Sequence, residues 1–112
     1  MNLLIDIDGT VSEDIPNEEY YRFKDAKLIK DALECVNKLY DIGHTITFFT
    51  SRIEEYREIT EKWLKDNGFK YDGLIMNKPR GGKYIVIDNL EVHGIQYKYN
   101  WKVILGEIHS KL

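Results

Sequence analysis

The feature of this sequence that most constrains its fold is the stretch Asn2–Thr10, an apolar run that ends in two carboxylates. The run Leu3–Ile5 is typical of a buried strand. Asp6 and Asp8 follow one residue apart, and the alternation of a strand would point both carboxylates to the same side. Gly9 then allows the chain to turn sharply. The sequence therefore predicts a strand that presents two acids at its carboxyl end.

Two carboxylates at the end of a buried strand are costly unless a positive group lies between them. Solvated turn acids would be the simpler reading, but the apolar run before Asp6 argues against it. A divalent cation is the simplest partner, and hard oxygen ligands of this kind suit Mg²⁺. We therefore interpret the chain as a magnesium-dependent enzyme, with Asp6 and Asp8 at the metal.

The whole chain sets broad limits on class. Its 112 residues are enough for one domain over 1–112 and too few for two. A net charge of −3 provides no global positive field to recruit nucleic acid. The single Cys35 cannot form an internal disulfide. The chain opens directly on a strand and has no run of membrane-spanning length, so we expect a cytoplasmic protein without a membrane partner.

Strand and helix patterns alternate along the chain. Helices are expected from Asp25 to Gly43, from Ser51 with a capping box to Asn67, and in a tail whose apolar face includes Trp101 and Leu112. Further strands are expected at 44–49, 71–76 and 84–87, with a short one at 94–97. This alternation predicts an α/β fold with a mostly parallel sheet covered by helices on both faces.

Chemistry-bearing residues follow four of these expected strands. The ligand site of such a sheet lies beyond the carboxyl ends of its strands. Besides the two acids, the residues expected there are Thr50, Ser51, Arg52, Lys78 and Asp88. Carboxylates, a hydroxyl and a lysine suit phosphoryl transfer, because they supply a nucleophile, metal ligands and donors for phosphoryl oxygens.

At these positions the sequence resembles the haloacid dehalogenase (HAD) superfamily of aspartate-nucleophile phosphatases. Asp6 to Thr10 matches its first motif in full, Thr50 the second, Lys78 the third and Asp88 the fourth. The resemblance covers roughly residues 2–89. It implies a three-layer Rossmann-like fold and an Mg²⁺-dependent phosphatase.

The resemblance also implies roles for the first two motifs. Asp6 would attack phosphorus and become an aspartyl-phosphate. Asp8 would protonate the leaving oxygen and later activate water, while its main-chain carbonyl binds Mg²⁺. Thr50 would hydrogen-bond the phosphoryl group, helped by the main-chain N–H of Ser51 at a helix start.

The later motifs are expected to complete the site. Lys78 would neutralise the nucleophile and the transferred group, with Lys83 as a weaker competitor for that role. Asp88 would hold Mg²⁺, although Asn89 stands where many relatives carry a second acid, and one charge fewer could weaken the metal site. Arg52 is expected to contact the substrate phosphate.

The substrate is less constrained than the reaction. The intervals between motifs leave no room for a cap domain, and the pattern resembles small cap-less phosphatases of polysaccharide biosynthesis, which implies a sugar phosphate. A more distant resemblance to the phosphatase domain of polynucleotide kinases implies 3′-phosphate removal from nucleic-acid ends or nucleotides. Arg52, Arg80 and Lys83 would then contact the backbone. A third alternative is a non-catalytic phosphate-binding or regulatory module.

Two segments are left with open roles. Residues 11–24 read as a long loop whose aromatic residues could form a lid or tether the loop to the core. The tail helix carrying Trp101 could cover the protein's own sheet or form a homodimer contact.

Overall fold

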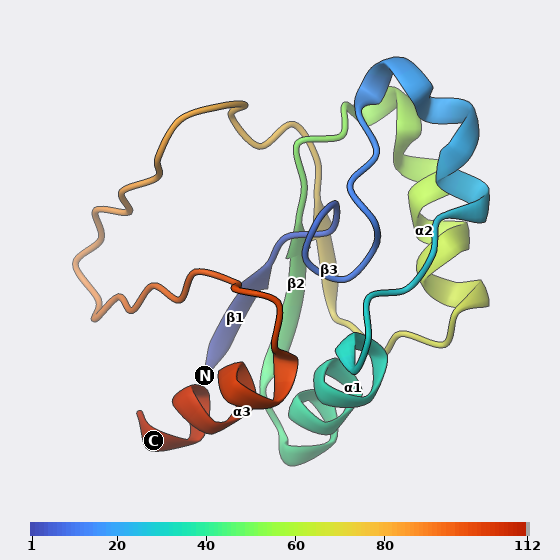
Figure 1. Ribbon diagram of the computed structural model, residues 1–112. Helices are drawn as coiled ribbons and strands as arrows, with labels where there is room; N and C mark the ends of the chain where they lie inside the picture. The colour runs from blue at the N-terminus through green and yellow to red at the C-terminus, as the bar shows by residue number, and fades with distance from the viewer. Residues whose placement is uncertain (112) are drawn as a thin grey trace.

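The computed structural model describes residues 1–111 and has a three-stranded parallel sheet at its centre (Figure 1). The strands are β1 (Asn2–Ile5), β2 (Thr45–Phe49) and β3 (Gly73–Ile75), and they lie in that order. Each parallel pair is joined by a crossover that contains a helix, as parallel strands require. The three expected strands before residue 80 are therefore confirmed, with β3 shorter than expected.

Within residues 1–111 the chain forms three α-helices and two 3₁₀ helices. In chain order they are η1 (Asn17–Asp25), α1 (Ala32–Ile42), η2 (Glu54–Tyr56), α2 (Arg57–Asp66) and α3 (Trp101–Ser110). None of the helices in the described residues is both long and apolar enough to cross a membrane.

The sheet is covered on one face. Ile5 pairs in register with Phe48, and both pack into a single core that includes residues of all three α-helices. On the opposite face, Leu4 is 59% exposed and Ile75 47% exposed. The expectation of helices on both faces is therefore wrong for residues 1–111, because no helix covers the second face of β1.

The tail forms the helix that its spacing predicted, and it covers the protein's own core. In α3, Trp101, Ile104 and Ile108 are buried, and α3 packs against α1. The indole N–H of Trp101 donates to the carbonyl of Thr10 at 2.7 Å. Leu112, expected on the same face, lies outside the described residues.

Two helices begin later than expected. α1 begins at Ala32 instead of after Asp25, because Asp31 has a positive φ of 66° that a continuous helix cannot contain. α2 begins at Arg57 after a 3₁₀ turn, and the side chain of Ser51 caps neither. The predicted helix ends are confirmed: Gly43 and Gly68 follow α1 and α2 with the left-handed φ that suits glycine there.

The expected strands at 84–87 and 94–97 are absent. Residues 77–100 run as an irregular segment that arches away from β1 before reaching α3 (Figure 1). Ile85 and Ile87 are 87% and 94% exposed. The sheet therefore ends at β1 in the described residues.

The segment after the first motif is tethered, which answers one of the open alternatives. Phe23 of η1 is fully buried and meets the Tyr56 ring edge-on, while Tyr20 stacks on Tyr56 with centroids 5.1 Å apart. Tyr21 remains exposed. η1 thus packs against the start of α2 and belongs to the core.

Candidate active site

The turn after β1 fixes the two leading carboxylates. The N–H groups of Thr10, Val11 and Ser12 all point to the carbonyl of Ile7, at 2.9–3.2 Å. Gly9 makes this possible with a φ of 82°, and its own N–H donates to the carbonyl of Ser12. The chain therefore curls tightly around one carbonyl, and Asp6 and Asp8 flank it.

Asp6 is a half-buried acid with several donors around it. The hydroxyl of Thr10 donates to Oδ2 at 3.2 Å, and Nζ of Lys78 lies 3.9 Å from Oδ1. Burial raises the pKa of Asp6, while the Lys78 charge and the hydrogen bonds from Ile7 and Thr10 oppose that rise. The result is a carboxylate that is only partly solvated, a state that favours reaction with an electrophile.

Lys78 and Thr50 are brought together by the exits of β2 and β3. The N–H of Thr50 donates to the carbonyl of Ile75, and the N–H of Lys78 donates to the carbonyl of Thr50, both at 2.9 Å. The Lys78 ammonium lies 4.4 Å from the ring centroid of Tyr84 and 5.5 Å from that of Phe49. The structure thus gathers Thr50 and Lys78, as expected, at the strand end that carries Asp6.

Arg52 lies elsewhere than expected. Its side chain is 1% exposed, and Nε and Nη2 each donate to one carboxylate oxygen of Asp8 at 2.9 Å. Nη1 donates to the hydroxyl of Thr60 at 3.1 Å. The expectation that Arg52 contacts a substrate phosphate is corrected, because all three of its donor nitrogens bind inside the protein.

Thr50 and Ser51 differ in their burial and in the hydrogen bonds that they make. Thr50 is fully buried, and its Oγ1 accepts the N–H of Arg52 at 3.1 Å. That hydroxyl still carries a hydrogen to donate. Ser51 is half-buried and does not stand at a helix start, so the expected anion site at a helix N-terminus is not formed. Its carbonyl instead accepts a bond from Asn17.

Asp88 is not brought to the other acids. It lies in the arched segment 77–100, and no group of three or more His, Cys, Asp or Glu able to hold a metal ion forms within residues 1–111. The expected metal set of Asp6, Asp8 and Asp88 is therefore corrected in its third member. The physical reason is the missing strand at 84–87, which would have ended at Asp88.

The remaining donors still fit a magnesium ion. Mg²⁺ in proteins usually keeps several waters and takes one or two carboxylates together with substrate phosphates. The Asp6 carboxylate and the main-chain carbonyl of Asp8 are hard oxygens on the same turn. Both oxygens of the Asp8 carboxylate accept bonds from Arg52, so the main-chain carbonyl is the oxygen of Asp8 that could serve as a ligand.

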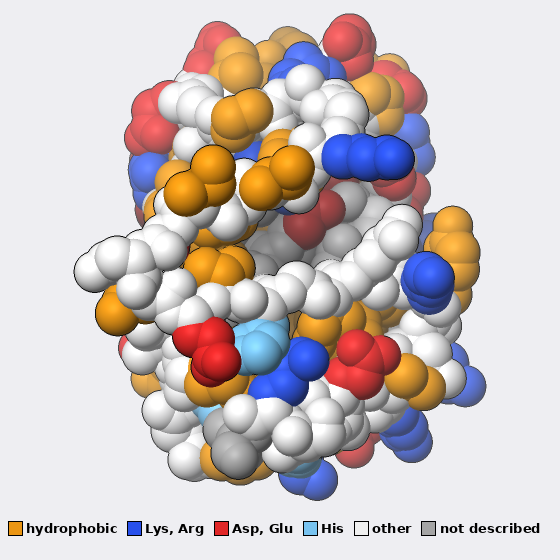
Figure 2. Space-filling model, turned by 90° about the vertical axis from the view of Figure 1, so that its left-hand side faces the viewer, with side chains coloured by type: hydrophobic (Ala, Val, Ile, Leu, Met, Phe, Trp, Pro, Cys, Tyr) orange, Lys and Arg blue, Asp and Glu red, His pale blue; other side chains and the backbone are white. Residues whose placement is uncertain are grey.

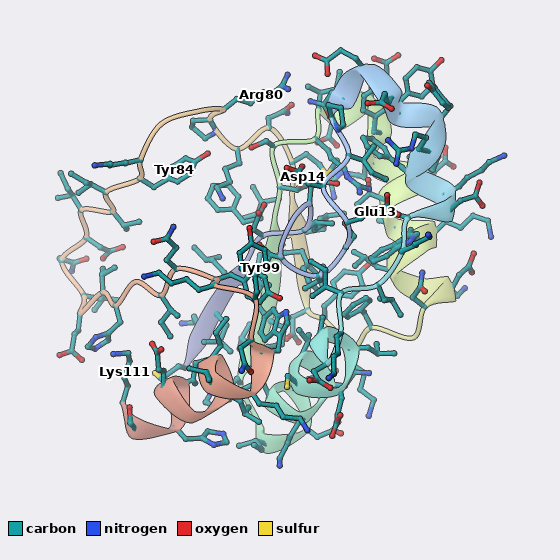
Figure 3. The ribbon with its side chains drawn as sticks, in the orientation of Figure 1. Glu13, Asp14, Arg80, Tyr84, Tyr99 and Lys111 are labelled. Carbon is teal, nitrogen blue, oxygen red and sulfur yellow. The ribbon has the colours of Figure 1, made fainter. Side chains whose placement is uncertain are left out.

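Several residues near the site were not predicted. Asp14 lies beside the Gly9 turn, and Figure 3 shows it close to the strand ends. The same view shows Tyr84 on the arched segment, together with Arg80, which was predicted above as a contact to a nucleic-acid backbone. Thr10 could have been identified from the sequence, since it belongs to the first motif. Phe23, Thr60 and Tyr84 could not, because only the folded chain brings them to Arg52 and Lys78.

The arched segment borders a hollow in the surface. Figure 2 views the molecule from that side and shows an acidic side chain at the back of the hollow, with hydrophobic and basic side chains on its rim. The exposed lysines and arginines of the arched segment are Arg80, Lys83 and Lys98.

Comparisons with known sequences point to one type of fold. The sequence model of a family described as the PITM 1-3 LNS2 domain matches residues 3–98. A candidate nucleotidase from Oceanobacillus iheyensis is 40% identical over 52 residues, which are 46% of this chain. The match spans only 27% of that protein's length.

Solved structures share the fold. A crystal structure from Vibrio cholerae aligns with a TM-score of 0.67 at 20% identity, over 97% of this chain and 94% of that chain. A chain of the Pnkp1/Rnl/Hen1 complex aligns with a TM-score of 0.59 at 26% identity, over 71% of this chain and 30% of the other. A chain of the Pnkp1/Rnl/Hen1 RNA repair complex gives 0.60 at 19%, over 98% and 31%.

Proposed function

The chain belongs to the family of the PITM 1-3 LNS2 domain, a HAD-like phosphatase fold, and on this premise we propose that it is an Mg²⁺-dependent phosphatase acting on phosphate monoesters. The observation that carries the proposal is the convergence of Asp6, Thr50 and Lys78 at one end of the sheet, with Nζ of Lys78 3.9 Å from the Asp6 carboxylate. A nucleophile beside a fixed cation is what attack on an anionic phosphoryl group requires.

The reaction has two steps. An oxygen of Asp6 attacks phosphorus as the bond to the leaving oxygen breaks. Asp8 enters this step protonated at an oxygen lone pair that Arg52 does not use, and it gives that proton to the leaving oxygen, which departs as the alcohol. Water then attacks phosphorus, Asp8 takes the proton of the water, and the bond to Asp6 breaks. Inorganic phosphate is released, and both carboxyl groups return to their starting states.

The other residues supply charge and position. The Lys78 ammonium offsets the negative charge that accumulates between Asp6 and the phosphoryl oxygens. The proposal also has the Thr50 hydroxyl donate to one of those oxygens, which requires this fully buried side chain to become accessible to the substrate. Mg²⁺, held by the Asp6 carboxylate and the Asp8 main-chain carbonyl, would supply further positive charge beside the phosphoryl group when bound.

The substrate is proposed as a small phosphorylated metabolite such as a sugar phosphate. The second candidate is a nucleotide or a 3′-phosphorylated nucleic-acid end. It is favoured by the 26% identity to a chain of the Pnkp1/Rnl/Hen1 complex and by the match to a candidate nucleotidase. Arg80 and Lys83 are exposed and available to a backbone, whereas Arg52 is not.

The test is phosphate release from a panel that contains an aryl phosphate, several sugar phosphates, nucleotides and a 3′-phosphorylated oligonucleotide. Each is run with Mg²⁺, with chelator, and with Asp6→Asn. We expect turnover that needs Mg²⁺ and is lost in Asp6→Asn, with the preferred substrate identifying the class. Tight Mg²⁺ binding without turnover on any substrate would instead favour a phosphate-binding module.

A further inference from the structure

The Arg52–Asp8 pair is the most enclosed ion pair in the part of the chain that the structure describes. Arg52 is 1% and Asp8 16% exposed, and two parallel N–H···O bonds of 2.9 Å join them. A fork of this kind fixes a carboxylate in both position and plane, which a single bond cannot do. The side chain of Asp8 is therefore held in one orientation.

Besides Asp8, two further residues hold Arg52. The ring centroid of Phe23 lies 3.8 Å from the guanidinium carbon, and the Thr60 hydroxyl accepts from Nη1 at 3.1 Å. Thr60 donates in turn to the carbonyl of Tyr56 at 2.7 Å. The guanidinium is thus fixed by η1 on its face and by α2 at its edge.

The contact with η1 extends this arrangement to the chain that follows the first motif. Phe23 is fully buried, and Tyr20 and Phe23 both pack on Tyr56 at the start of α2. Phe23 closes the guanidinium off from water. The orientation of Asp8 consequently depends on Phe23, which lies 23 − 8 = 15 residues further along the chain.

We propose that Arg52, held by Phe23 and Thr60, is a positioning residue that orients the Asp8 carboxyl group for proton transfer to the leaving oxygen. The inference rests on the proposed phosphatase function. All three donor nitrogens of Arg52 bind within the protein, so Arg52 is placed to act through Asp8 and not on the substrate itself. Lysine cannot replace it, because an ammonium is a point charge without the planar fork.

The test uses the dependence of rate on the leaving group. With Arg52→Lys, kcat/KM for an unactivated alkyl phosphate should fall roughly 10²-fold, because its departing oxygen needs a well-placed proton. For 2,4-dinitrophenyl phosphate, whose leaving group departs without a proton, the loss should stay below about tenfold. kcat/KM is the right parameter, since it reports the step in which the leaving group departs.

The matched control is Arg22→Lys, the same substitution at an exposed pair with Glu13 and Glu19. It should leave both rates unchanged. Phe23→Leu, which keeps the ion pair and removes the stacked ring, should show a smaller loss with the same preference for the alkyl substrate. This variant also serves if Arg52→Lys does not fold, as judged by circular dichroism. Equal losses on both substrates in these variants would overturn the inference while leaving the phosphatase proposal intact.

A second readout does not depend on activity. In ¹⁵N-labelled protein, the Nε–H of Arg52 should give a slowly exchanging resonance that is absent in Arg52→Lys and shifted in Asp8→Asn. A resonance that exchanges freely and ignores Asp8→Asn would overturn the pairing itself. If the wild-type protein hydrolysed neither phosphate, the proposed function would fail and with it the catalytic part of this inference.

Discussion

Two stretches of this chain have the same sequence pattern, but only one of them forms a strand of the sheet. Leu3–Ile5 is an apolar run followed by Asp6, and Tyr84–Ile87 is an apolar run followed by Asp88. The first pairs with β2 and carries its acid to Lys78. The second pairs with nothing in the described residues, and Ile87 is 94% exposed. A high strand propensity therefore shows only that a segment is able to form a strand. Whether it does so depends on packing and pairing with a neighbouring strand.

The comparison is tested most strongly by removing each acid in turn. Asp6→Asn should reduce phosphate release by roughly 10³-fold or more, because it removes the proposed nucleophile. Asp88→Asn at saturating Mg²⁺ should reduce it by less than roughly tenfold, or about 1.4 kcal/mol. Both are measured as kcat/KM on the preferred substrate of the panel. Equal losses would show that the segment around Asp88 closes onto β1 during catalysis.

Truncating one isoleucine in each region compares their packing. Ile46→Ala in β2 should lower the free energy of unfolding by about 2–5 kcal/mol, because Ile46 is fully buried in the core. The matched Ile87→Ala should change it by no more than about 0.5 kcal/mol. Urea denaturation followed by circular dichroism measures both. A large cost at Ile87 would place that side chain in the core in solution.

Tyr84 belongs to the arched segment, and its ring lies beside the Lys78 ammonium of the site. Its replacement therefore tests how much the arched segment contributes to catalysis. Tyr84→Leu should weaken catalysis only a few-fold, since a cation–π contact of this exposure contributes about 0.5–1 kcal/mol. Tyr84→Phe keeps the ring beside Lys78 and should match the wild type. Steady-state rates for the three proteins decide this, and a loss shared by the phenylalanine variant would assign the effect to the hydroxyl bond with Pro79 instead.

The smallest expected effect is on stability and comes from the burial of Asp6. Its pKa in the folded protein lies above the ordinary value of 3.8, so the folded state binds the proton more tightly than the unfolded chain does. The ionised carboxylate therefore destabilises the fold as pH rises through that pKa. Asp6→Asn should raise Tm at pH 7 in the presence of chelator, and the gain should vanish below pH 3.8. A gain that persisted in acid would rule out this origin.

The first half of the site could be predicted from the sequence because its signals are local. The run Leu3–Ile5, the acids after it and the turn at Gly9 depend on neighbours within ten residues. The approach of Lys78 to Asp6 followed from placing both at the ends of parallel strands. Arg52 and Asp8 were likewise expected near each other, because they follow the paired strands β1 and β2. The direction of the Arg52 side chain had no local signal, since its guanidinium is held by Phe23 and Thr60 from other parts of the chain.

The misplaced boundaries also have local physical causes. Asp31 adopts a left-handed conformation, which delays the start of α1. Asn77 accepts the N–H of Glu54 with its side-chain oxygen, the group that Ser51 was expected to satisfy. In this second case, the side chain of Asn77 takes the place of the expected cap from Ser51. A pattern that spans a few residues cannot predict a partner from so far along the chain.

The hydrogen bonds between the exits of β2 and β3 have a consequence for engineering. Thr50 donates to the carbonyl of Ile75, Lys78 donates to the carbonyl of Thr50, and Asn77 donates to the carbonyl of Arg52. These three bonds make the two loops one module, so a library that varies either loop alone would disturb the other. Variation of specificity is better directed at residues 79–99, whose sequence could be exchanged without breaking any of those bonds.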